Sequence, residues 1–200
     1  MNFVKYVLII SFISNSYCQE TQIDLRDKRW KAGVLTGYGF KTGLIGNKTY
    51  VYQPYIIMVE FQKKKVYFKN NLSLDYSISA EYNAVKYYNK RSDTGVTEML
   101  DNTDIGLNFN FVLCKKISEK VDLYLILGTG PHYLHNKLTR QAKGLIFSDN
   151  LGIGSNVNIN ENYILDFRFV LRHLSNADLK YPNIGIENKI LFVGIKKSLN

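Results

Sequence analysis

Hydrophobic and polar residues alternate along much of this chain, which is the pattern of a β-strand with two different faces. Between Asn71 and Tyr82, every second residue is polar or charged, and the residues between them are leucine, tyrosine, isoleucine or alanine. The same division recurs between Asp104 and Leu113 and again between Tyr163 and Arg172. Helical periodicity is hard to find anywhere. The pattern therefore predicts an all-β fold.

Eight segments of this kind can be counted, with ends uncertain by about 2 to 4 residues. Each is long enough to cross a bilayer at a tilt, which takes about 9 to 11 residues. An even number of strands permits closure, and closure pairs every backbone amide, as lipid requires. The expected segments are Lys31–Phe40, Val51–Phe61, Phe68–Tyr82, Asp104–Lys115, Val121–Tyr133, Phe147–Val157, Tyr163–Ser175 and Ile186–Lys196.

Alternation alone does not say which face of such a barrel is the inside. In a soluble, lipocalin-like barrel the apolar face would fill the interior and the polar face would meet water. In a transmembrane barrel the polar face lines the lumen, and the aromatic and aliphatic residues face lipid. Both readings agree with the strand pattern, so the choice depends on other features of the chain.

The N-terminus favours export. Lys5 is followed by an apolar run, Tyr6–Ile13, and then by Ser16-Tyr17-Cys18, which has small residues at the positions that a signal peptidase reads. The run is far shorter than the roughly 20 residues of a membrane-spanning helix. We therefore expect a signal peptide over residues 1–18 and one barrel domain over residues 19–200. Cys114 would then be the only cysteine left, so we expect no internal disulfide.

Composition narrows the class further. The chain has 200 residues, 46% hydrophobic and 14% aromatic, with a net charge of +9, which suits a single strand-rich domain. No basic helix or aromatic-basic module accompanies the positive charge, so nucleic acid is not an expected partner. Lysines at a bilayer edge would instead attract anionic headgroups. His132 and His135 have no cysteine or carboxylate beside them and are interpreted as polar rim residues rather than metal ligands.

Candidate chemistry lies between Arg172 and Glu187. His173 and Ser175 are two residues apart on an expected strand, so their side chains point to the same side. A connection rich in turn-forming residues follows, and Glu187 opens a new apolar segment that can return antiparallel toward His173. A serine hydroxyl needs a neighbouring base to become a nucleophile, and that base needs an acid to orient it. Without further support, the same residues are equally compatible with the rim of a non-catalytic barrel.

These residues carry a resemblance to a known family. The string His173-x-Ser175-Asn176-Ala177, followed by Pro182-Asn183-x-Gly185-Ile186-Glu187, resembles the signature of the lipid A 3-O-deacylases of the outer membrane, the PagL family. Residues 147–154 also resemble the family's strand before the active-site strand. One difference is Asp178, which stands where the family pattern has a small residue, often glycine.

The resemblance implies an eight-stranded antiparallel transmembrane β-barrel in the outer membrane that hydrolyses the ester-linked acyl chain at position 3 of lipid A. Ser175 would be the nucleophile, His173 the base and Glu187 the orienting acid. Asn176 is then expected to help form the oxyanion site, and Asn183 to support the loop. The substrate would be lipid A or lipopolysaccharide, with no metal and no cofactor required, and the oligomeric state is not readable from the sequence.

Two further functions stay open at this point. One is a structural or adhesive outer-membrane barrel without activity, and the other is an outer-membrane phospholipase or general esterase with the same triad. His173 and Ser175 have the same parity as Phe167 and Phe169 on this expected strand. If the two phenylalanines face lipid, His173 and Ser175 also face outward. The active site would then open to the membrane.

Overall fold

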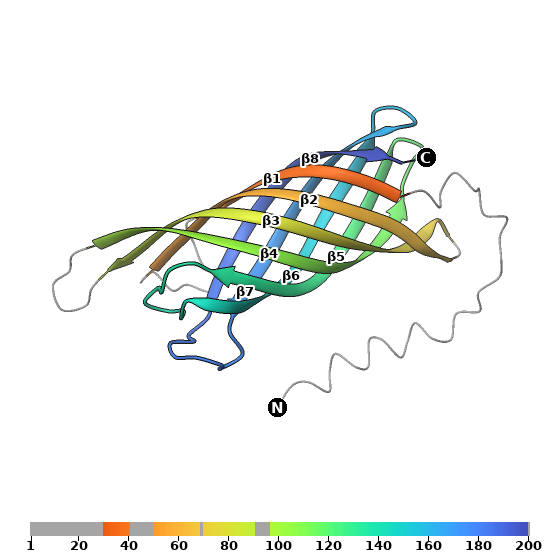
Figure 1. The fold of residues 1–200 in the computed structure, drawn as a ribbon. Helices are drawn as coiled ribbons and strands as arrows, with labels where there is room; N and C mark the ends of the chain where they lie inside the picture. The colour runs from red at the N-terminus through yellow and green to blue at the C-terminus, as the bar shows by residue number, and fades with distance from the viewer. Residues whose placement is uncertain (1–29, 41–49, 69, 91–96, 200) are drawn as a thin grey trace.

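The computed structural model describes residues 30–40, 50–68, 70–90 and 97–199. Each strand pairs antiparallel with the next, and β1 pairs with β8, which closes the barrel (Figure 1). The all-β, eight-stranded antiparallel barrel is thus confirmed. The predicted signal peptide, residues 1–18, lies outside the described residues. The strands are β1 (Trp30–Gly39), β2 (Tyr50–Phe68), β3 (Leu72–Lys90), β4 (Thr97–Lys116), β5 (Val121–Leu134), β6 (Gly144–Asn158), β7 (Tyr163–Ser175) and β8 (Ile186–Ser198).

Strand β7 has the predicted bounds, whereas β2, β3 and β4 are longer than expected. Strand β2 continues to Phe68, so the prediction that Phe68 begins the third strand was wrong. Strands β3 and β4 remain paired as far as Lys90 and Thr97. Figure 1 shows the β3–β4 hairpin projecting beyond the rest of the barrel. In the extension of β3 the inward residues Val85 and Tyr87 are apolar and buried, whereas Lys86 points outward. The polar and apolar faces that mark Asn71–Tyr82 are therefore not continued there.

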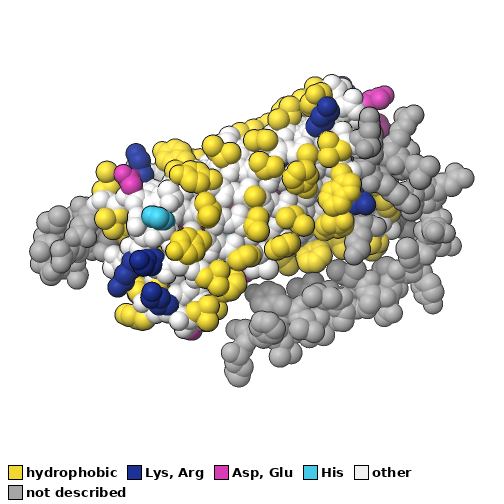
Figure 2. Space-filling model, in the orientation of Figure 1, with side chains coloured by type: hydrophobic (Ala, Val, Ile, Leu, Met, Phe, Trp, Pro, Cys, Tyr) yellow, Lys and Arg dark blue, Asp and Glu magenta, His cyan; other side chains and the backbone are white. Residues whose placement is uncertain are grey.

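Polar side chains from β2, β3, β4, β6, β7 and β8 line the lumen beside buried apolar clusters, and outward apolar residues form the outer wall. On the face that Figure 2 shows, hydrophobic side chains spread along the wall and charged side chains gather toward its two ends. The apolar outer wall contradicts the soluble-barrel reading, in which the outer face would be polar. Buried polar residues include Asp75, Ser77, Glu81, Asn83, Asp104, Asn108, Asn110 and Arg168, and exposed apolar residues include Ile57, Ile105, Leu107, Phe109, Phe111, Leu125, Leu127, Leu151 and Val193.

Ion pairs occupy the half of the lumen that is nearer to the start of β1 and the end of β8. Arg168 donates two hydrogen bonds of 3.0 Å to the Glu60 carboxylate and a third of 2.7 Å to Asp166. Lys196 lies 2.8 Å from Glu60 and 2.7 Å from Asp166. Buried charges are tolerated only when they are paired in this way, because desolvation is otherwise too unfavourable. The network ties β7 to β2 and β8 through the barrel interior.

A second inward arginine, Arg172, lies nearer to the C-terminal end of β7 and also anchors this strand. Arg172 donates hydrogen bonds of 2.6 and 3.0 Å to the two oxygens of Glu81 on β3, and one of 2.8 Å to Asn150 on β6. The arginine fork is planar, and its bidentate pairing restricts the side chain to one orientation. His173 follows Arg172 and faces the opposite side of the wall. The lumen contacts of Arg172 therefore anchor the strand that carries His173 and Ser175.

His132 is a lumen residue and not the rim residue that the sequence suggested. Its Nδ1 lies 2.6 Å from Asp104 Oδ1, and its Nε2 lies 3.2 Å from Asn108 Oδ1. His132 has the same parity on β5 as the buried residues Tyr124 and Ile126, so its side chain points into the lumen. His135 is exposed in the connection that follows. Among the residues that the structure describes, no group of three or more His, Cys, Asp or Glu side chains is placed to hold a metal ion.

The lengths of the connections orient the barrel. Short turns join β4 to β5 and β6 to β7 at the end where β1 begins and β8 finishes, as the pairing of Lys31 with Ser198 shows. Longer connections, residues 135–143 and 176–185, lie at the opposite end. Transmembrane barrels have short periplasmic turns and longer extracellular loops. The C-terminal end of β7 therefore lies on the outer side. None of the described residues forms a helix long and apolar enough to cross a membrane.

Candidate active site on the outer wall

The structure brings the three sequence-predicted groups to one outward region of the wall. His173 on β7 stands directly opposite Glu187 on β8 in the strand register, and Ser175 lies two residues further along β7. All three residues are partly exposed. The antiparallel return of β8 explains this arrangement, because it places the first outward carboxylate of that strand beside the imidazole.

Gly185 packs directly against the imidazole of His173. A Cβ atom at residue 185 would lie 2.7 Å from His173 Cε1 and 3.4 Å from Nε2. The backbone at Gly185 has a φ of +77°, a conformation that residues with a side chain rarely adopt. Both the close contact and the backbone conformation require glycine. Residue 185 thus forms one wall of the space that the imidazole occupies.

The three groups are neighbours that have not formed the full set of catalytic hydrogen bonds. Within the described part of the chain, His173 makes no hydrogen bond to the Ser175 hydroxyl or to the Glu187 carboxylate. Catalytic hydrogen bonds are often long or poorly aligned without substrate and tighten in the substrate complex. The arrangement thus places a hydroxyl, an imidazole and a carboxylate at neighbouring outward positions.

A second carboxylate, which sequence reasoning missed, flanks the imidazole. Asp149 on β6 stands opposite His173 in the register, on the other side from Glu187, and is exposed. One of its oxygens accepts a hydrogen bond of 2.8 Å from Thr129 Oγ1. The signal in the sequence is an acid that interrupts the outward apolar parity of Phe147 and Leu151. A charge on a lipid-facing position near the outer rim therefore points to function.

Asn176 and Asn183 hold the β7–β8 loop together. The backbone N–H of Asn176 donates to Asn183 Oδ1 at 2.9 Å, and its side-chain Nδ2 donates to the Lys180 carbonyl at 2.5 Å. Asn176 is only 1% exposed. Asn183 Nδ2 in turn donates to Asp178 Oδ1 at 2.8 Å. Asn176 is therefore next to Ser175, but one of its amide hydrogens is used inside the loop.

The backbone explains why a small residue suits position 178. Ala177 and Asp178 have φ values of 50° and 60°, in the left-handed region that glycine adopts most easily. Aspartate also tolerates this region, since its short polar side chain can form local hydrogen bonds. The bond that Asp178 accepts from Asn183 is such a bond. The difference from the family pattern is thus accommodated within the loop.

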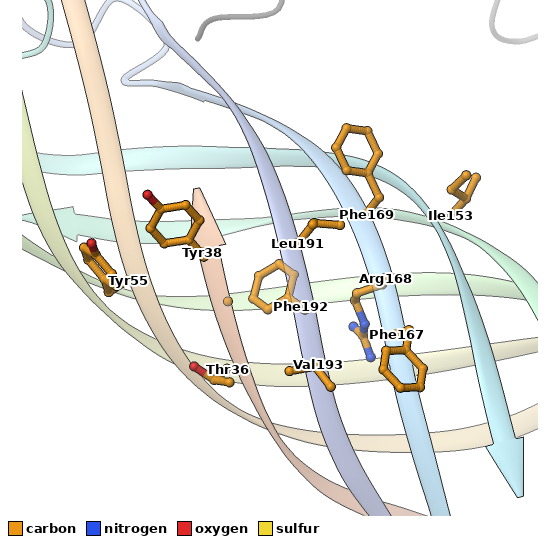
Figure 3. Close-up of a pocket in the computed structure, with 11 residues that line it drawn as sticks. Thr36, Tyr38, Tyr55, Ile153, Phe167, Arg168, Phe169, Leu191, Phe192 and Val193 are labelled. Atoms are coloured by element: carbon orange, nitrogen blue, oxygen red, sulfur yellow. The ribbon is translucent and has the colours of Figure 1, made fainter. Parts of the chain in front are cut away.

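An apolar hollow of about 660 Å³ lies on the same side of the barrel, further toward the periplasmic end (Figure 3). Phe169 and Leu191, which are paired across β7 and β8, are part of its lining. They lie four residues along their strands from His173 and Glu187, which is about 13 Å. Tyr38 and Tyr55 close the side formed by β1 and β2. The hollow is suited to hydrocarbon that lies against the wall.

A closed barrel with a polar, ion-paired lumen and an apolar outer wall defines the class of this protein, the outer-membrane β-barrels. The family model described as lipid A 3-O-deacylase (PagL) matches residues 56–196, and the chain belongs to this family. The matched residues include the outward groups on β6, β7 and β8. The outer-membrane location and the family expected from the sequence are both confirmed.

Solved structures agree on the fold. The crystal structure of the outer membrane enzyme PagL is similar with a TM-score of 0.55 and 20% identity, over 81% of this chain and 97% of that chain. Neisserial surface protein A (NspA) is similar with a TM-score of 0.52 and 10% identity, over 85% and 96%. At these identities the likeness shows the barrel fold alone. A comparison with curated protein sequences gave no match.

Proposed function

We propose that this protein is an esterase of the outer leaflet that removes the acyl chain ester-linked at position 3 of lipid A. The observation that carries the proposal is the shared outward placement of His173, Ser175 and Glu187 within the residues that the family model matches. A nucleophile on the outer wall faces acyl chains, whereas a lumen site would face water and buried ion pairs. The site thus suits an ester that is embedded in the membrane.

In the proposed reaction, Ser175 Oγ attacks the ester carbonyl while His173 takes the hydroxyl proton. The carbon–oxygen bond to the sugar then breaks, and His173 returns the proton to the leaving sugar oxygen. Water attacks the resulting acyl-serine in the same manner and releases the fatty acid. Glu187 orients the imidazole and stabilises its charged form, and Asn176 with nearby backbone N–H groups is proposed to stabilise the oxyanion.

The apolar hollow supports an acyl-chain substrate. Its lining residues Phe169 and Leu191 lie on the same two strands as His173 and Glu187, beyond the intervening pair Leu171 and Lys189. A chain that leaves the ester carbonyl at Ser175 can run down this wall and remain in contact with Phe169 and Leu191. An amide-linked chain is expected to survive, because an amide has a poorer leaving group and a less electrophilic carbonyl.

The proposal is tested with purified, folded barrel in detergent and lipid A as the substrate, with products identified by mass spectrometry. The unaltered protein should release one hydroxyacyl chain, and Ser175→Ala and His173→Asn should release none. Ser155→Ala is a matched control, since Ser155 is an outward serine near the other end of β6. No release by the unaltered protein would refute the proposal. Fatty acids released from phospholipid instead would indicate a phospholipase that uses the same triad.

A further inference from the structure

The connection beside the candidate site, residues 176–185 between β7 and β8, is paired with a second outer connection, residues 135–143. The N–H of Ile184 donates to the Arg140 carbonyl at 2.9 Å, and the N–H of Ala142 donates to the Pro182 carbonyl at 2.8 Å. Gln141 and Asn183 form a β-bridge between these two bonds. The two connections therefore form a short antiparallel ladder, and the conformation of one constrains the other.

The side chain of Arg140 reaches past this ladder to the start of β8. Its Nε donates to the Gly185 carbonyl at 3.0 Å, and its Nη2 donates to the Ile184 carbonyl at 3.3 Å. The guanidinium also lies over the ring of Tyr50 on β2, 4.4 Å from the ring centroid. A planar guanidinium can donate to two carbonyls and stack on a ring at once, whereas a lysine ammonium cannot.

These contacts fix the peptide units that surround the imidazole. Gly185, which accepts from Arg140, is the residue that packs against the His173 ring. The Tyr50 hydroxyl accepts a hydrogen bond of 3.1 Å from the backbone N–H of Glu187. Arg140 and Tyr50, stacked on each other, thus hold both Gly185 and Glu187. The imidazole lies between the two residues that this pair restrains.

We propose that Arg140, supported by Tyr50, is a positioning residue that fixes Gly185 and Glu187 about the His173 imidazole. The inference rests on the proposed esterase function, since it assigns Arg140 a role in that same site. Arg140 acts through other residues, because two of its donor groups are already bonded to carbonyls. A simple surface cation, by contrast, would act only by attracting the anionic groups of the substrate.

The test compares three variants of the full-length, folded protein on lipid A. Arg140→Gln removes the fork, and we expect kcat to fall about 10- to 100-fold with little change in KM, as for a small misplacement of a catalytic group. Arg140→Lys keeps the charge but not the fork, and should be intermediate. Lys143→Gln removes one charge from an exposed position in the same connection and should leave kcat unchanged. Heat-modifiable gel mobility confirms that each barrel is folded.

A second readout separates positioning from attraction of the substrate. A small fluorophosphonate reports the reactivity of Ser175 without any lipid headgroup, so its labelling rate should fall in Arg140→Gln by the same factor as kcat. Normal labelling and normal kcat in Arg140→Gln would overturn the inference and leave the esterase function intact. Equal effects of Arg140→Gln and Lys143→Gln, confined to KM, would also overturn it. An unaltered protein that neither labels nor hydrolyses lipid A would overturn both proposals.

Discussion

Gly185→Ala is expected to impair the proposed reaction by displacing the imidazole while leaving the barrel folded. The added Cβ would lie 2.7 Å from His173 Cε1, and two carbon atoms in contact normally lie about 3.5 to 4.0 Å apart. The ring must therefore move back by about 1 Å, or the peptide at residue 185 must rotate. Either movement changes the distance from the imidazole to the Ser175 hydroxyl.

The magnitude follows from two separate effects. An alanine with φ near +77° is strained by about 1 to 2 kcal/mol, which lowers the free energy of unfolding by that amount. A misplacement of 1 Å in a catalytic group reduces the rate by about 10²-fold, which corresponds to about 2.7 kcal/mol in the activation free energy. We thus expect a large loss of kcat together with a modest loss of stability.

Gly144→Ala supplies the matched control. Gly144, at the start of β6, also has a positive φ, of +110°, but a Cβ atom there would meet nothing within 4 Å. Both variants should lose comparable stability in urea titrations that follow folded and unfolded gel mobility. Only Gly185→Ala should lose hydrolysis of lipid A, measured as kcat with purified protein. Equal activity in the two variants would refute the claim that residue 185 sets the position of the imidazole.

Two further outcomes are expected. If Glu187 is the orienting acid, Glu187→Gln should lower kcat by about 10²- to 10⁴-fold, and Asp149→Asn should lower kcat less. Steady-state kinetics measures both variants, and the reverse order would assign the orienting role to Asp149. Arg168→Met should destabilise the barrel by about 3 to 5 kcal/mol in urea titrations, because Glu60 and Asp166 would lose their bidentate partner, and unchanged stability would contradict this.

The fold could be predicted wherever the two faces of a strand meet different surroundings. Strand β7 was predicted with its correct bounds because its outward residues are apolar and its inward residues include Asp166, Arg168 and Arg172. The end of β2, residues 62–68, was missed because the lysine run that begins at Lys63 is polar on both faces. Backbone hydrogen bonds still pair these residues of β2 with β3, but the sequence shows no alternation of polar and apolar residues over them.

The candidate site could be predicted in part for the same reason. The proximity of His173, Ser175 and Glu187 follows from parity on one strand and the antiparallel return of the next. The position of Asp149 depends on the register between β6 and β7, which the turn between them sets and the sequence does not reveal. The contacts of Arg140 depend on the conformations of two irregular connections, and such contacts have no periodic signature.

Mass spectrometry of lipid A from cells that make the intact protein tests the central claim most directly. Cells with the Ser175→Ala variant, folded and present at equal abundance in the outer membrane, serve as the comparison. Lipid A from cells with the intact protein should lack one ester-linked hydroxyacyl group, at position 3, and lipid A from the Ser175→Ala cells should keep it. Identical lipid A in both strains would contradict the account.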